Sequence, residues 1–404
     1  MKPLIVNLLL FLAGLMAGLS SSEAMAKPFI PDSPTYILEE LQTRPTDAVA
    51  QELRELRSQL MRQPDNLSLA TRLSRRYIDQ ARAEADPRYL GYAQAVLASW
   101  WKMENPPSQV LILRATINQS NHHFNEALDD LSAVLKVDPY NAQAWLTRAS
   151  IFRVQGNYRE ANHDCLKLLR LATELVTTSC ISGVAAHNGR LSKGYNVLLN
   201  VLRKSREASV SPPEKLWVLT DLAEMAVRVG LIQTAEAHFK EALAQNITDS
   251  YLMGAYSDFL LDQRRPAEVV SLLKGKIRAD GLLLRLALAE QQLDSPDLPI
   301  HVAALHARFE ASRMRGDVVH RREEARFTLA FMNDPQRALQ LALDNWAVQR
   351  EPWDARIVLE SAIAAHRYID ARPVVDWLAE SHLEDVQIAR YVRQLNGVKK
   401  PCCG

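Results

Sequence analysis

The chain has 404 residues, of which 48 are basic and 47 acidic, so its formal net charge at pH 7 is +1. This balance gives no overall field directed at nucleic acid or at an anionic membrane, and neither is expected as a partner. Hydrophobic residues make up 48% of the chain and there are only 14 glycines. That composition favours a well-packed helical protein and argues against a turn-rich β fold.

The first residues have the pattern of a targeting segment. Lys2 precedes an apolar run over residues 4–19, and residues 24–26 (Ala-Met-Ala) supply small side chains at the spacing that a signal peptidase reads. We therefore expect residues 1–26 to be a cleaved signal peptide and the mature protein to be periplasmic or secreted. The alternative is an uncleaved anchor, since the run approaches the roughly 17 residues that span a bilayer. Such an anchor would be the protein's sole contact with a membrane.

The N-terminal part of the mature chain has an irregular helical pattern. Residues 27–35 contain three prolines and are expected to form an extended lead-in. Over residues 36–107, apolar side chains return at helical intervals, with an interruption near Pro45. Amphipathic helices are predicted at residues 67–83 and 87–101. We interpret this region as N-terminal helices and a degenerate capping repeat, because one face of a terminal repeat meets water.

Residues 108–279 contain the clearest internal repeat. Apolar residues recur at intervals of 34 in three pairs, Ala115 and Ala149, Ala127 and Ala161, and Leu131 and Cys165. Pro139 marks the boundary between the two units, and Gly156 allows a tight turn within the second. Spacing, small residues and turn signals together resemble the tetratricopeptide repeat family. Weaker units follow up to residue 279.

Over residues 280–396 the units degrade into helix pairs of the same size and a final capping helix. Residues 397–404 are expected to be a flexible tail. Its two cysteines, Cys402 and Cys403, could remain free in a frayed end, form a disulfide with each other, or form a bond to another molecule. The resemblance thus covers roughly eight units. It implies an all-α fold, a right-handed α-solenoid of helix-turn-helix repeats, in an exported bacterial member of the family.

The resemblance also implies recognition of a protein or peptide through a concave groove lined by the first helix of each repeat. Eleven polar residues on first helices are not needed for the repeat's packing and are candidates for this groove. They are Thr116, Gln119, Ser120, Gln143, Thr147, Ser150, Arg153, Thr220, Asp221, Glu224 and Arg228. Their charges are mixed, whereas the family's best-known groove is a cationic clamp, so a C-terminal carboxylate is not the expected ligand. An ordinary solvated helix face is the alternative at each position.

Two cysteines of the repeat region also have alternative interpretations. Cys165 lies late in one second helix and Cys180 lies early in the following first helix, so a disulfide would join two units in an oxidising compartment. Alternatively, Cys165 fills an apolar core position as an unpaired cysteine. The sequence alone leaves both open.

Catalytic motifs are missing from the sequence. It contains no His-Glu-x-x-His, no Gly-x-Ser-x-Gly, no phosphate-binding glycine loop and no Cys-x-x-Cys. The histidines at 122–123 fall at a turn, and those between 301 and 320 share no helical face, so no metal or cofactor is expected. We expect a non-catalytic scaffold of the bacterial cell envelope. The alternative is a component of an envelope export or polysaccharide secretion machinery, in which tryptophans contact sugar. The oligomeric state is not indicated.

Overall fold

The computed structural model describes residues 47–205, 210–317 and 319–398. The expected signal peptide, the lead-in, the helix before Pro45 and the pair Cys402 and Cys403 lie outside these residues. Of the two compact units into which the chain divides, residues 53–404 contain α3 to α22. Every regular element of the described residues is helical, which confirms the all-α class. None of these helices is both long enough and apolar enough to cross a membrane.

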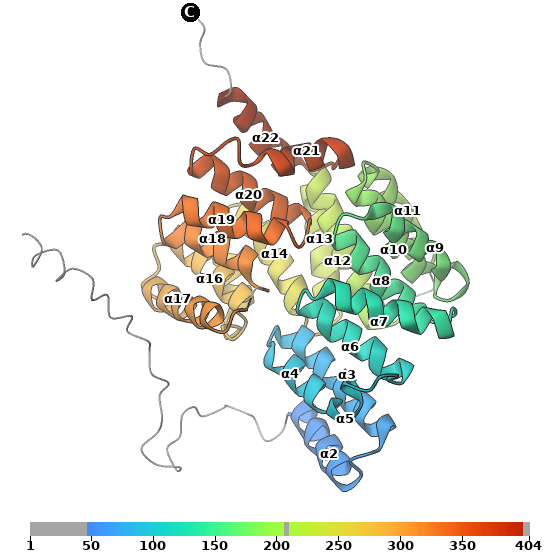
Figure 1. Ribbon diagram of the computed structural model, residues 1–404. Helices are drawn as coiled ribbons and strands as arrows, with labels where there is room; N and C mark the ends of the chain where they lie inside the picture. The colour runs from blue at the N-terminus through green and yellow to red at the C-terminus, as the bar shows by residue number, and fades with distance from the viewer. Residues whose placement is uncertain (1–46, 206–209, 318, 399–404) are drawn as a thin grey trace, which may run out of the picture. The chain divides into compact units, whose positions relative to one another are not determined.

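The helices follow one another as pairs joined by short turns (Figure 1). Nine pairs occur in the described residues: α3 (Leu67–Glu84) with α4 (Arg88–Ala95), α6 (Ser108–Ser120) with α7 (Phe124–Val137), α8 (Ala142–Val154) with α9 (Tyr158–Lys167), α10 (Glu174–His187) with α11 (Leu191–Lys204), α12 (Pro212–Val229) with α13 (Ile232–Leu243), α14 (Ser250–Asp262) with α15 (Pro266–Leu273), α16 (Asp280–Gln292) with α17 (Leu298–Met314), α18 (Arg321–Phe331) with α19 (Pro335–Trp346), and α20 (Pro352–Ala364) with α21 (Arg372–Ser381). Four further helices are α2 (Ala48–Arg62), α5 (Ala98–Trp101), the short 3₁₀ helix η1 (Leu168–Arg170) and α22 (Val386–Val398).

The residues that recur at intervals of 34 form the contacts between helices. All six are at most 1% exposed: Ala115, Ala149, Ala127, Ala161, Leu131 and Cys165. Alanine at a crossing lets two helices approach closely, and a larger apolar residue one turn later fills the space beside the crossing. Repetition of this contact gives an α-solenoid of tetratricopeptide-like helix pairs, as the sequence predicts.

Polar caps fix where the first helices begin. Before five of them, a side-chain oxygen accepts a hydrogen bond from a backbone N–H of the first turn. The capping residues are Asn66, Asn141, Thr173, Ser211 and Asp249. Each cap satisfies one of the N–H groups that a helix N-terminus otherwise leaves unpaired.

The turn within each pair contains one residue of left-handed backbone conformation. These nine residues are Ala85, His122, Gly156, Gly189, Gly230, Arg264, Asp294, Asn333 and His366. Glycine adopts positive φ without steric cost, but most of these turns use other residues. His122 occupies the turn position 34 residues before Gly156, and its ring stacks on Phe124 with the centroids 5.4 Å apart. Burial lowers the pKa of His122 to about 4, so this histidine is a neutral turn residue.

One predicted helix is divided in the structure. The sequence suggests a continuous helix over residues 87–101, whereas α4 ends at Ala95 and α5 begins at Ala98. Between them, the N–H of Leu97 donates to the carbonyl of Gln94, three residues earlier, at 3.0 Å. This tighter turn interrupts the α-helical pattern. Leu97 is completely buried there.

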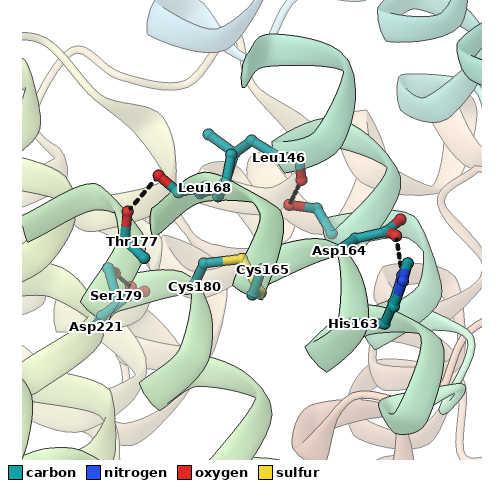
Figure 2. Close-up of a disulfide and its surroundings, with 10 residues drawn as sticks. Leu146, His163, Asp164, Cys165, Leu168, Thr177, Ser179, Cys180 and Asp221 are labelled. Carbon is teal, nitrogen blue, oxygen red and sulfur yellow. Dashed lines mark hydrogen bonds and ion pairs between the residues drawn. A yellow bond between two sulfur atoms is a disulfide. The ribbon is translucent and has the colours of Figure 1, made fainter. Parts of the chain in front are cut away.

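A disulfide joins two consecutive helix pairs. Cys165 of α9 and Cys180 of α10 are bonded, with their Cα atoms 5.5 Å apart (Figure 2). Beside the disulfide, the Thr177 hydroxyl of α10 donates to the carbonyl of Leu168 in η1 at 3.1 Å. The sequence leaves open a disulfide or an unpaired Cys165, and the structure contains the disulfide. It ties α10, which also contributes to the cavity described below, to the preceding unit.

Replacing both cysteines, Cys165→Ala with Cys180→Ala, should lower the free energy of unfolding by about 3 kcal/mol, because a cross-link spanning 15 residues restricts the unfolded chain. Urea unfolding with and without reductant measures this difference. Reductant should destabilise the wild type and leave the double variant unchanged. A wild-type protein that is equally stable under both conditions would contradict the prediction.

Candidate functional site

A cavity of about 490 Å³ opens among helices that lie far apart in sequence. Residues of α3, α8, α10, α12, α14, α16, α18, α20 and α22 contribute to its lining, as do one residue of α13 and loop residues 85, 249, 351 and 385. We call this space the charged cavity, because eight carboxylates and six arginines line it. They are Asp221, Glu224, Asp249, Asp258, Asp262, Glu323, Glu351 and Asp385, with Arg82, Arg153, Arg228, Arg285, Arg322 and Arg356.

Four of the residues proposed from the sequence line this cavity. They are Arg153 of α8 and Asp221, Glu224 and Arg228 of α12. The two first helices are not adjacent in the chain, since α10 and its partner lie between them. The structure therefore brings together polar residues of separate repeats, as a groove lined by first helices requires.

Three candidate threonines prove to be packing residues instead. Thr116, Thr147 and Thr220 are between 3% and 8% exposed. The hydroxyls of Thr116 and Thr220 each donate to the carbonyl four residues earlier in the same helix, at 2.8 Å. Thr147 accepts a hydrogen bond from Gln143 at 2.9 Å. A threonine can thus satisfy its polar atom within a helix while its methyl group packs, so these residues do not form a groove surface.

The remaining candidates lie outside the lining of the charged cavity. Gln143 is exposed, and three others are partly exposed: Gln119, Ser120 and Ser150. Both candidate serine hydroxyls donate back to their own helix, Ser120 to the carbonyl of Thr116 and Ser150 to that of Leu146, each at 3.0 Å.

Arg228 holds distant parts of the chain together. Its Nη2 donates to the carbonyl of Ala186 at 2.6 Å and to that of Glu384 at 3.2 Å, and its Nε lies 3.8 Å from Asp385 Oδ2. The side chain is 9% exposed. Arg228 does line the cavity, but most of its N–H groups are already bound to the protein. These hydrogen bonds join α10 and α12 to the loop before α22.

Two further contacts close the cavity. The N–H of Arg350 donates to the carbonyl of Val154 at 2.7 Å, which joins the end of α8 to the loop before α20. The Ser250 hydroxyl donates to the carbonyl of Ala83 at 2.7 Å, across 167 positions of sequence. Both acceptors are backbone carbonyls near the C-terminal ends of first helices, where no partner within the helix is available.

One part of the lining consists of closely paired charges. Asp258 accepts from Arg285 and from Arg326, each at 2.6 Å. Arg356 makes two bonds of 2.7 Å to Asp262, and its guanidinium lies 4.2 Å from the ring centroid of Trp353. Burial opposes the charge of Asp258, but the two guanidinium groups outweigh it and lower the pKa of that carboxyl. These pairs leave the wall polar and electrically balanced.

Two carboxylates of α12 accept hydrogen bonds from hydroxyl groups, and the Arg153 guanidinium acts on both from a greater distance. Asp221 and Glu224 are three residues apart on α12 and so share a face. Asp221 accepts from the Ser179 hydroxyl at 2.6 Å (Figure 2), and both Glu224 oxygens lie 3.0 Å from the Tyr251 hydroxyl. Burial raises the pKa of Asp221 to about 6; burial and the neighbouring Asp221 raise that of Glu224 to about 7. Tyr251 is nonetheless 62% exposed, because it faces the cavity space.

A third carboxylate lies between an arginine and a histidine. Glu351 Oε1 is 3.9 Å from Arg153 Nε, and its Oε2 is 3.6 Å from His187 Nε2. Both separations exceed hydrogen-bonding distance. Arg153 Nε, His187 Nε2 and Glu351 Oε1 are buried without a hydrogen-bond partner. Although burial disfavours a charge on Glu351, the Arg153 guanidinium lowers the pKa of this carboxyl.

The sequence contains a signal for some of the cavity residues that are not among the candidates named above. His187 lies 34 positions after Arg153, so it occupies the same place near the end of the next first helix. Tyr251 and Arg285 also lie on first helices, α14 and α16, whose repeats keep less of the family pattern. Glu351 had no such signal, because it precedes α20 and reaches the cavity only through contacts between distant repeats.

No family model matches the chain, and no curated protein matches it either. Three solved structures resemble its fold. A tetratricopeptide repeat protein from Parabacteroides merdae is 15% identical over 60% of this chain and 92% of its own, with a TM-score of 0.42. The APC/C hetero-tetramer Cut9–Hcn1 is 15% identical over 88% and 72%, with a TM-score of 0.49. The human IFIT1 dimer with m7Gppp-AAAA is 14% identical over 87% of each chain, with a TM-score of 0.39. Likenesses this remote assign no function to this chain.

Replacing the joining arginine, Arg228→Leu, should lower the free energy of unfolding by about 3 kcal/mol, because Asp385 and two carbonyls lose their buried donor. Amide hydrogen exchange should accelerate most in α22 and the loop before it. Arg315→Leu is the control, since that side chain is 62% exposed and pairs with Asp317 at the surface; we expect a change within about 0.5 kcal/mol. Equal stability of the two variants would show that Arg228 does not hold the cavity closed.

Proposed function

We propose that this chain is a scaffold that binds a segment of a protein partner in the charged cavity. The observation that carries this proposal is the convergence of polar side chains from non-adjacent first helices, among them Arg153, Asp221 and Glu224, on one space. Its volume of about 490 Å³ lies within the range of ligand sites. Helical repeats commonly use such inner surfaces for extended peptides or partner helices.

Binding rather than catalysis is proposed because of how the charged groups are held. Asp258 and Asp262 are fixed by bidentate or multiple arginine contacts, which maintain the shape and polarity of a wall. Asp221 and Glu224 accept hydrogen bonds from neutral hydroxyls, and these leave some of their lone pairs open to the cavity. The paired charges shape the wall, and the open carboxylate lone pairs can accept hydrogen bonds from a partner; this is an arrangement for binding.

The tryptophans do not favour a carbohydrate-binding role. All seven lie in the described part of the chain, and each is buried or partly buried. Trp353 alone among them lines the charged cavity, and guanidinium groups of Arg356 and Arg326 lie over its ring at 4.2 and 4.8 Å. A sugar would have to displace these cations in order to stack there.

Export to an oxidising compartment belongs to the same proposal. The disulfide between Cys165 and Cys180 supports it, because such bonds persist in secreted and periplasmic proteins and are rare in the cytosol. The signal-like pattern of residues 1–26 points to the same destination. The proposed setting is therefore the bacterial cell envelope, where the scaffold would hold a polypeptide for assembly or transport.

A photo-crosslinking amino acid, benzoylphenylalanine, tests the binding site directly when placed at Tyr251 in cells that produce the protein. Its side chain would face the charged cavity, where Tyr251 is 62% exposed. We expect illumination to attach a polypeptide, identified by mass spectrometry of the adduct. The adduct should disappear when Glu224→Lys reverses a charge of the lining.

The matched control is the same replacement at Tyr140, which is 78% exposed and lies outside the cavity lining. Equal labelling from both positions would indicate nonspecific encounter. Adducts consisting of glycan or small molecules, with no polypeptide, would overturn the scaffold proposal.

Export predicts a specific mature protein. The purified native chain should begin at Lys27, fractionate with periplasmic or secreted proteins, and contain Cys165 and Cys180 in oxidised form. N-terminal sequencing, cell fractionation and non-reducing peptide mapping measure these three properties. A chain that still begins at Met1 and remains in the cytosol would contradict the prediction.

A further inference from the structure

We propose that the charged cavity recognises a protonated amine or guanidinium group, supplied by a basic side chain of the bound polypeptide. The subsite consists of Asp221 and Glu224 of α12, Glu351 before α20, and His187 at the end of α10. This inference rests on the proposed function and specifies the chemistry of the segment that the scaffold holds. Neither the repeat pattern nor the fold alone implies it.

The first argument is local charge. Asp221, Glu224 and Glu351 act on one another, and the Arg153 guanidinium acts on all three. Arg228 also acts on Glu224 and Glu351, and Arg322 acts on Glu351. Four other arginines of the lining have carboxylate partners of their own. The pairs are Arg228 with Asp385, Arg285 with Asp258, Arg356 with Asp262 and Arg322 with Glu323. When the three carboxyl groups are ionised, the subsite has more negative than positive charge. A further cation would offset this excess.

The second argument is independent and concerns hydrogen bonding at His187. This side chain is 7% exposed, and its Nδ1 lies 2.8 Å from the carbonyl of Gly183, so Nδ1 bears a proton. Burial lowers the pKa of His187, which favours the neutral ring with a lone pair on Nε2. That lone pair faces Glu351 Oε2 at 3.6 Å and has no hydrogen-bond partner. Two acceptors facing each other in a buried place call for a donor that lies to one side, within hydrogen-bonding distance of both.

The groups already bound to the subsite leave capacity for such a donor. Ser179 and Tyr251 each contribute one hydroxyl hydrogen, whereas an ionised carboxylate has about four acceptor positions. An ammonium provides three N–H donors and a guanidinium five. The exposed ring of Tyr251 beside Glu224 offers a face on which a cation could also lie.

A metal ion fits this subsite less well than an organic cation. Within the described residues, no three side chains of histidine, cysteine, aspartate or glutamate converge closely enough to hold a metal. An ammonium or guanidinium tolerates the wider spacing, because it donates hydrogen bonds in several directions to separate acceptors.

The test uses the purified mature chain and N-acetyl-lysine methylamide as the probe, with binding followed by chemical-shift titration. N-acetyl-norleucine methylamide has nearly the same shape without the charge and serves as the neutral comparison. We expect saturable binding of the lysine probe and none of the norleucine probe. Spermidine is titrated in parallel, to separate a basic side chain from a free polyamine.

Two conservative variants, Glu224→Gln and Asp221→Asn, should each weaken binding of the lysine probe by about tenfold, the usual effect of losing a charge-assisted hydrogen bond. Glu310→Gln is the matched control, because that carboxylate is 57% exposed and lies outside the cavity. Thermal unfolding of each variant verifies that the fold is retained. If the control variant loses as much affinity as the other two, the subsite is wrong.

Binding to the wild type should also strengthen between about pH 6 and about pH 8, as Glu224 loses its proton while lysine keeps its own. The charged and titratable groups that act on Glu224 are Asp221, Arg153, Arg228, Tyr251 and Glu351. Burial lowers the pKa of His187, which moves the titration of this side chain toward more acid pH and away from this range. Affinity that is independent of pH would contradict a role for Glu224.

The outcomes separate this inference from the proposed function. If crosslinking at Tyr251 captures a polypeptide but the lysine probe does not bind, the scaffold stands and the cation subsite is overturned. If spermidine binds and the lysine probe does not, the ligand is a free polyamine and the inference is likewise overturned. If the lysine probe binds as predicted but no polypeptide is captured, the subsite stands and the scaffold proposal fails.

Discussion

The buried guanidinium of Arg228 is the contact on which the charged cavity depends. Packing between neighbouring pairs accounts for a solenoid of any length, but it does not bring residues 186 and 384 to one side chain. Arg228 does so by donating to the carbonyls of both. The bond from the Arg350 N–H to the Val154 carbonyl joins equally distant segments with backbone atoms alone. The cavity therefore exists only where these long-range contacts hold.

Buried charge has two different consequences in this molecule. Where arginine meets carboxylate directly, as Arg285 meets Asp258, the pair makes a rigid and balanced wall and contributes more to geometry than to stability. Where a carboxylate accepts its hydrogen bond from a neutral hydroxyl, as Glu224 does from Tyr251, burial still disfavours the ionised form. The raised pKa of Glu224 shows this. The second arrangement is the one that leaves chemistry available to a partner.

The sequence predicted most of the fold, because helix pairing is a local property that the 34-residue interval records. It predicted part of the site for the same reason: Arg153 and Asp221 follow from their places on first helices. It failed at Thr220, since helical periodicity shows which face a residue is on but not how far the neighbouring pair covers that face. It failed at Glu351 because that residue reaches the cavity through a contact between segments about 200 positions apart, and no local pattern encodes it.

Closure of the chain upon itself also has a consequence in time. Each pair packs chiefly on its neighbours, so the early pairs can form before the last ones have folded. The carboxylates of α12 can therefore lie in a packed helix before Glu351 and the Glu384 carbonyl reach them. A truncated or partly folded chain has well-formed helices but an incomplete cavity. The charged cavity is thus a property of the fully folded chain.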